Sequence, residues 1–146
     1  MNYSVSKNEY LISTDKSKID VEYVHAFLTQ SYWSPGVPVQ TVKKAMENSL
    51  SFGLYLRDKQ IGYTRVITDT ATFAYLADVF VDENSRGQGL GKWLIDTILA
   101  HPDLQGLRRI ILTTKDAHKL YQKCGFISVP NPERFMVYNP TVHKIK

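Results

Sequence analysis

A glycine-rich segment, placed between a strand-like stretch and an amphipathic helix, constrains this sequence more than any other feature. Residues 87–91 read Gly-Gln-Gly-Leu-Gly. Glycine lets the main chain approach a ligand closely, because it carries no Cβ atom. The first turn of a helix adds unpaired N–H groups and a partial positive charge. With Arg86 and Lys92 on either side, the segment predicts a binding site for a phosphate-like anion.

The segment lies within a series of predicted strands and helices. A long apolar strand over 72–81 precedes it, and a helix with Leu94, Ile95 and Ile98 on one face follows it. The other expected elements are, in chain order, a strand over 10–13, helices starting at Asp20 and Thr41, strands over 51–56 and 61–67, a strand over 108–113, a helix from Asp116 to Tyr121, and a strand pair over 126–129 and 135–138. This order predicts an α/β (α+β) fold with one mixed, mostly antiparallel central sheet flanked by helices.

Length and composition favour a single domain over 1–146. One cysteine, Cys124, provides no disulfide framework, and we expect it to be a packed thiol. The four histidines (25, 101, 118 and 143) show no metal-ligand spacing, so we expect no metal. No apolar run is long enough for a membrane span and no signal peptide is evident, which predicts a cytoplasmic protein without membrane contact.

Spacing excludes the two commonest phosphate loops. A P-loop ends in Gly-Lys-Ser/Thr, whereas this sequence has Trp93 after Gly91 and Lys92. A dinucleotide fingerprint requires G-x-G-x-x-G on the first strand of a βαβ unit, and here the last glycine is one residue too early and the segment lies in mid-chain.

Three motifs together resemble the GCN5-related N-acetyltransferase (GNAT) family. The spacing Arg-x-x-Gly-x-Gly at Arg86, Gly89 and Gly91 is similar to the family's pyrophosphate loop. The preceding strand over 75–81 and the later Leu-Tyr-x-x-x-Gly-Phe over 120–126 are similar to two further family signatures. The resemblance covers roughly residues 51–126. It implies the acyl-CoA N-acyltransferase fold and an N-acetyltransferase that uses acetyl-CoA as co-substrate.

The resemblance also implies how acetyl-CoA is held. The family binds the pyrophosphate with loop amides, pairs the pantetheine arm with the strand before the loop, and often has an asparagine where this chain has Thr114. The implied cofactor-binding residues are Val79, Phe80, Val81, Arg86, Gly87, Gln88, Gly89, Leu90, Gly91, Lys92 and Thr114.

Two side chains are candidates for catalysis. Tyr121 is the candidate acid for the departing thiolate, since a phenol and a thiol titrate within a few pH units of each other; the alternative is a tyrosine that only packs. Asp78 is the candidate base, which would require burial; the alternatives are a structural aspartate and a water relay. The family polarises the carbonyl with a main-chain N–H at a strand bulge, which would be that of Val79.

The acceptor is expected to be a small-molecule amine, bound near Tyr32, Trp33, Arg65 and Phe73, although core packing or solvation explains these residues almost as well. Acetylation of a protein terminus or lysine stays open, as does a non-catalytic acyl-CoA sensor. The net charge of +4 suits an anionic ligand, but no basic patch interleaved with aromatics indicates nucleic acid. The chain is expected to be a monomer or a homodimer.

Overall fold

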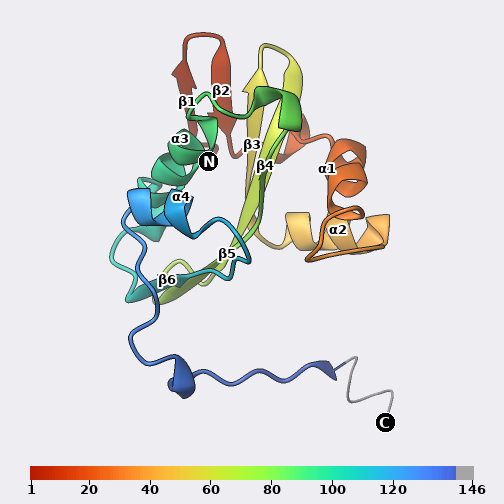
Figure 1. Ribbon diagram of the computed structural model, residues 1–146. Coiled ribbons are helices and arrows are strands. Elements are labelled where there is room, and N and C mark those ends of the chain that lie inside the picture. The colour runs from red at the N-terminus through yellow and green to blue at the C-terminus, as the bar shows by residue number, and fades with distance from the viewer. Residues whose placement is uncertain (141–146) are drawn as a thin grey trace.

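The computed structural model describes residues 1–140, and in them six strands form one sheet (Figure 1). The strands lie in the sheet in sequence order: β1 (Ser4–Lys7), β2 (Tyr10–Ser13), β3 (Leu50–Leu56), β4 (Lys59–Thr68), β5 (Phe73–Val81) and β6 (Arg109–Ile111). Neighbouring strands are antiparallel except β5 and β6, which are parallel. The predicted mixed, mostly antiparallel sheet is confirmed.

Helices cover both faces of the sheet (Figure 1). The four α-helices of the described residues are α1 (Val21–Leu28), α2 (Val39–Glu47), α3 (Leu90–Leu99) and α4 (His118–Lys123), and short 3-10 helices occupy 16–18, 83–85, 102–104 and 132–134. One core packs α3 and Tyr121 of α4 against the sheet, and a second core packs α1 and α2 against Tyr63 and Phe80. The middle of β3 is buried on both faces for this reason. None of the helices in the described part of the chain is long and apolar enough to cross a bilayer.

Local capping explains where the helices begin. The Asp20 carboxylate accepts a hydrogen bond from the Tyr23 N–H at 3.1 Å, so α1 starts where the sequence predicts. Helix α2 starts two residues before the predicted cap Thr41, because Pro38 occupies the N-cap with an extended backbone. The predicted cap Asp116 is also wrong: α4 begins after Ala117, whose N–H donates to Thr114 Oγ1 at 3.0 Å.

The strand pair expected over 126–129 and 135–138 is absent from the described residues. A 3-10 helix forms at Pro132–Arg134 instead, closed by the Phe135 N–H donating to the Pro132 carbonyl at 3.1 Å. This turn does not reverse the chain, and the following segment runs away from the sheet (Figure 1). Pro130 and Pro132 also lack the N–H groups that a strand pair needs. Strand β1, which the sequence pattern missed, is a mostly exposed edge strand with a single apolar residue, Val5.

Candidate active site

Strands β5 and β6 pair briefly and then separate. Their parallel pairing covers Phe73 to Tyr75 on β5 and Arg109 to Ile111 on β6. Strand β5 continues to Val81, whereas β6 ends at Ile111. The edge of β5 from Leu76 onward therefore has no strand beside it among residues 1–140. Such an edge presents main-chain donors and acceptors to whatever occupies the gap.

A β-bulge lies in β5 where the gap opens. Tyr63 pairs with Phe80 and Arg65 pairs with Ala77, so Thr64 alone faces Asp78 and Val79. The extra residue is accommodated at Asp78, whose φ of 56° lies in the left-handed region. The buried Thr64 hydroxyl donates to the Ala77 carbonyl at 3.0 Å, which satisfies a main-chain acceptor that regular pairing would have used.

The bulge changes which face each side chain of β5 occupies. Leu76 packs in the core beneath α3, whereas Phe80, an even number of residues later, packs in the core beneath α1. Asp78 lies on the same face as Phe80, and Val79 packs against the opposite core, as simple alternation over 78–80 predicts. The inserted residue thus brings a carboxylate to the α1–α2 side of the sheet.

After the bulge, the main-chain N–H and C=O groups of alternate residues point to opposite edges of β5, and those of Val79 and Val81 point toward the gap. The Asp82 N–H donates to the Ile61 carbonyl at 2.6 Å, so Asp82 and Phe80 face β4 and their neighbours face outward. The Val81 carbonyl on this outer edge accepts from Arg86 Nε at 3.1 Å. Arg86 is thereby held between the strand and the glycine segment.

The glycine segment forms the N-terminal end of α3. Gly87 and Gly89 have φ values of 82° and 77°, and a Cβ at either position would meet no atom within 4 Å. They are therefore required for backbone conformation, since no protein atom crowds either position. Gly89 is the N-cap and provides no side-chain hydrogen bond to the first turn, so the first N–H groups of α3 lack a side-chain cap. At Gly91 a Cβ would lie 3.5 Å from Leu120 of α4, an ordinary van der Waals contact, so α3 and α4 lie next to each other here without needing a glycine.

Two polar side chains of this segment already have partners. Lys92 Nζ lies 2.7 Å from Asp96 one turn later on α3, so part of its charge is balanced. The Gln88 side-chain oxygen accepts from the Tyr10 hydroxyl at 3.0 Å, which ties the loop to β2. Leu90 places its side chain in the core.

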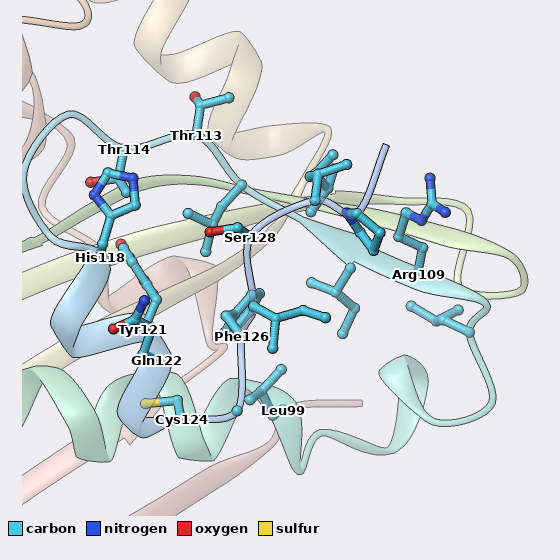
Figure 2. Close-up of a pocket in the computed structure, with 18 of the residues that line it drawn as sticks. Leu99, Arg109, Thr113, Thr114, His118, Tyr121, Gln122, Cys124, Phe126 and Ser128 are labelled. Atoms are coloured by element: carbon cyan, nitrogen blue, oxygen red, sulfur yellow. The ribbon is translucent and has the colours of Figure 1, made fainter. Parts of the chain in front are cut away.

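A pocket of about 580 Å³, termed here the inner pocket, opens beside the bulge. Its walls come from the loop after α1, from β4 and β5, from the loop after β6 and from α4. The lining residues used below are Tyr32, Trp33, Arg65, Asp78, Val79, Thr114 and Tyr121. Tyr121 is also part of a second pocket of about 690 Å³, bounded by β6, α4 and residues 126–130 (Figure 2). His118 is exposed and lines only this second pocket.

The Tyr121 phenol is held in a mainly apolar setting. The residue is buried, and its ring packs edge-on against that of Phe126, with the two ring centroids 5.8 Å apart. Burial, together with smaller contributions led by Tyr32, raises the pKa of Tyr121 to about 12. The phenol consequently keeps its proton at neutral pH and can act as a donor.

Asp78 is fixed by two donors. Trp33 Nε1 donates to Oδ1 at 2.9 Å and Arg65 Nε donates to Oδ2 at 2.6 Å. Both side chains of the ion pair are largely buried, and Arg65 also donates to the Ser49 hydroxyl at 3.2 Å. The positive charge of Arg65 is thus balanced within the protein.

Two loops meet across the inner pocket. The Lys115 N–H donates to the Tyr32 hydroxyl at 3.1 Å, and Lys115 Nζ lies 5.5 Å from the Tyr32 ring centroid. Trp33 packs edge-on against Tyr32 at 5.1 Å. The loop after α1 and the loop after β6 therefore form one aromatic wall.

Two predicted site residues lie elsewhere. Phe73 is at the start of β5, 41% exposed and opposite Arg109, five residues or roughly 17 Å along the strand from Asp78. Phe80 stacks on Phe27 at 3.8 Å in the second core, so its side chain does not reach the gap. The sequence pattern did not predict the positions of these two side chains, because the bulge determines which end and which face of β5 line the pocket.

Four residues near the site were missed by sequence reasoning. Thr64 supports the bulge, and Lys115 closes the pocket on Tyr32. The hydroxyls of Tyr75 on β5 and Thr113 in the loop after β6 lie 2.9 Å apart. Each acts through a residue distant in sequence, and no local motif marks any of them.

The candidate site offers no metal centre in the described residues, where no group of three potential ligands occurs. His143 lies outside the described residues. Cys124 is half-buried with a pKa raised mainly by burial, which fits a packed thiol better than a nucleophile.

Comparison with known proteins agrees with this geometry. The family model described as "Acetyltransferase (GNAT) family" matches residues 19–126. The Gibberella zeae protein named "Putative acetyltransferase FG08082" is 30% identical over 141 residues, covering 81% of this chain and 78% of its own.

Solved structures show the same fold. A Xanthomonas campestris protein assigned to the GNAT family is 44% identical with a TM-score of 0.86, covering 92% of this chain and 96% of its own. A GNAT acetyltransferase from Elizabethkingia anophelis with acetyl-CoA bound has a TM-score of 0.65 at 14% identity, covering 92% and 91%. The latter likeness concerns the fold alone.

Proposed function

Because this chain belongs to the GNAT acetyltransferase family, we propose that it transfers an acetyl group from acetyl-CoA directly to a primary amine of a small molecule. One observation carries the proposal: the bulge at Asp78 and the gap between β5 and β6 open onto a pocket whose opposite wall holds Tyr121. A donor lying in the gap and an acceptor lying in the inner pocket would meet at this point.

The free main-chain groups fit the two polar parts of acetyl-CoA. The N–H groups at the start of α3, which lack a side-chain cap and lie beside Arg86, suit a pyrophosphate. The outward edge at Val79 and Val81 suits an amide-containing arm added like a strand. Thr114, which lines both pockets, takes the place across the gap from that edge. The acetyl-CoA named in the Elizabethkingia structure, which has the same fold, supports this assignment.

The transfer balances without a covalent enzyme intermediate. The amine nitrogen attacks the thioester carbonyl carbon, and the carbonyl oxygen gains negative charge that the Val79 N–H stabilises. The C–S bond then breaks, the amide forms, and the thiolate takes the Tyr121 proton. The extra proton on the nitrogen leaves to water, and Tyr121 is reprotonated from solvent.

Asp78 acts in this proposal as a positioning residue and not as the base. Each of its oxygens accepts one hydrogen bond, from Trp33 and from Arg65, and these two contacts fix the carboxylate between the pocket wall and β4. The same two contacts hold Trp33 against the pocket. Water, which reaches the open mouth of the pocket, takes the amine proton.

The acceptor is expected to be a primary amine with an apolar body. Tyr32 and Trp33 provide an aromatic wall, and the Arg65–Asp78 pair presents no net charge. The charge of Arg65 is already balanced by Asp78, so an acceptor carboxylate gains less from meeting it than from meeting an unpaired arginine.

A panel of aromatic, aliphatic and carboxylated amines, with lysine peptides included, tests the proposal by release of CoA thiol. We expect the fastest release with small aromatic or aliphatic amines. Tight acetyl-CoA binding without release above spontaneous hydrolysis for any amine would instead identify an acyl-CoA sensor. Release with peptides alone would identify a protein acetyltransferase.

A further inference from the structure

Lys115 lies at the rim of the inner pocket, which it lines together with Tyr32, Thr114 and Tyr121. Among residues 1–140, no other lysine lines the inner pocket or the second pocket. A lysine side chain is a primary amine on a flexible four-carbon stem. Lys115 therefore has the chemistry of the proposed acceptor, a primary amine with an apolar body, and it is attached to the protein.

The amine of Lys115 lies over the aromatic wall of this pocket. The main-chain N–H of Lys115 donates to the Tyr32 hydroxyl at 3.1 Å, and Nζ lies 5.5 Å from the centroid of the Tyr32 ring. Trp33 packs edge-on against the same ring. Lys115 thus meets the aromatic surface that we expect to hold the apolar body of a free acceptor.

Few contacts restrain the Lys115 side chain. Within residues 1–140 it forms no ion pair with a carboxylate, whereas Lys92 Nζ lies 2.7 Å from Asp96. Lys115 is exposed, so its side chain can change rotamer without leaving a packed core. The contact of its ammonium group with the Tyr32 ring is weak at such an exposed position.

The position of Lys115 brings its amine close to the point of transfer. Thr114, the preceding residue, lines both pockets. Burial, with a smaller contribution from nearby Tyr32, raises the pKa of Tyr121 to about 12, so the ring beneath the Lys115 amine and the proposed acid belong to one site. An amine tethered at such a site reacts as an intramolecular nucleophile, at a high effective concentration.

We propose, resting on the acetyl transfer proposed for this chain, that the protein acetylates its own Lys115 when acetyl-CoA is bound and no small amine occupies the inner pocket. The Lys115 nitrogen, after giving one proton to water, attacks the thioester carbonyl carbon. The C–S bond breaks, and the thiolate takes the Tyr121 proton. The second nitrogen proton leaves to water, and Tyr121 is reprotonated from solvent. One acetyl-CoA yields one CoA and one acetyllysine per chain.

The modification changes the pocket rim. Acetylation removes the positive charge of Lys115 and with it the cation–π contact to Tyr32. The main-chain hydrogen bond between these two residues does not depend on the charge and stays. The product is an uncharged amide, so the reaction at this residue ends after one acetyl group.

Peptide mass spectrometry of the full chain, incubated with acetyl-CoA and no added amine, tests this inference. We expect the mass of one acetyl group at Lys115, appearing at least about 10-fold faster than at Lys119. Lys119, an exposed lysine on α4 that lines neither pocket, reports spontaneous acetylation. The rate per chain should not change on dilution of the protein, because amine and site belong to one chain. A small aliphatic amine should suppress the modification by occupying the pocket.

Variants separate enzymatic from spontaneous acetylation. Tyr121→Phe should slow the modification of Lys115 about 100-fold and leave that of Lys119 unchanged. Lys115→Arg keeps the positive charge and should remove the modification at this position, whereas the matched variant Lys119→Arg should leave acetylation of Lys115 unchanged. Both lysines are exposed, so thermal unfolding should show that both arginine variants are folded.

Three results would overturn the inference. Equal rates at Lys115 and Lys119 would show that only spontaneous chemistry occurs. A rate per chain that rises with protein concentration would show that one molecule modifies another. Unmodified Lys115 would also overturn it, and thiol release measured with small amines then decides the proposed function separately: release leaves the proposed function standing, and its absence counts against both.

Discussion

The Nε atom of Arg65 lies 2.6 Å from Oδ2 of Asp78, at the residue where the bulge in β5 gives a positive φ. The two residues come from neighbouring strands and neutralise each other beside the inner pocket. Trp33, in the loop after α1, donates a further hydrogen bond to the Asp78 carboxylate. The contact links the shape of β5 to the wall that faces the acceptor.

Asp78→Asn should therefore affect acceptor binding more than chemistry. Loss of the ion pair frees Trp33 and Arg65, and we expect KM for the amine to rise roughly 10-fold while kcat falls less than about 3-fold. The pH dependence of kcat/KM should keep its acidic limb, because that limb then comes from protonation of the amine itself. Asp58→Asn, in the β3–β4 turn, is the control. A kcat that falls a hundredfold with loss of the acidic limb would identify Asp78 as the base.

Tyr121→Phe should lower kcat about 100-fold, because the thiolate loses its proton donor. The Kd for CoA should change less than about threefold, since the ring and its contact with Phe126 remain. Tyr75→Phe is a matched control, as this tyrosine also lines the inner pocket. Unchanged turnover in the Tyr121 variant would leave the residue a packing role only.

Gly89→Ala should weaken CoA binding through backbone strain. A left-handed φ costs a residue with a Cβ about 1–2 kcal/mol, and relief of that strain would turn the first amides of α3 away from the ligand. Gly106→Ala supplies the control, because Gly106 has φ 78° and an equally open surrounding but lies outside the glycine segment. Both variants should lose similar stability in urea, whereas calorimetry should show weaker CoA binding for Gly89→Ala alone.

Thr64→Val should destabilise the bulge. The substitution keeps the volume but leaves the Ala77 carbonyl without its donor, at a cost of about 1–3 kcal/mol. Denaturant unfolding measures the loss, and acetyl transfer should fall with it because Val79 shifts. Thr64→Ser keeps the hydroxyl and should retain the bulge. Equal transfer by the valine and serine variants would separate the bulge from catalysis.

His101 should make stability depend on pH. Its ring is buried against Tyr3 and Phe52, and burial lowers the pKa of His101. As pH falls, the unfolded chain therefore protonates this histidine at a higher pH than the folded chain does. The contribution of the neutral ring to the free energy of unfolding is complete above about pH 6.5, and it is lost as pH falls toward the pKa of the folded state. Urea unfolding between pH 7.5 and 5 should show the decline. In a His101→Gln variant the free energy of unfolding should decline less over this pH range. An identical decline would show that His101 does not cause it.

The local features of the fold follow from residues that are close together in the chain. Asp20 caps α1, glycines at 87 and 89 permit left-handed backbone, and periodicity places Leu94, Ile95 and Ile98 on the buried face of α3. Each depends on residues within one or two helical turns of each other, so the amino-acid sequence is sufficient to predict it. The same local motifs indicated the family, which the comparisons confirm.

Tertiary structure alone decided the features that join distant residues. An extra residue at Asp78 cannot be recognised from alternation, because the bulge exists only relative to the register of β4. The closure of Tyr32 on Lys115 spans 83 residues, and Arg65 meets Asp78 only across paired strands. The path of residues 131–140 was mispredicted for the same reason: strand propensity over 135–138 favours pairing with a strand edge, but it specifies neither which edge nor whether the preceding turn leads to one.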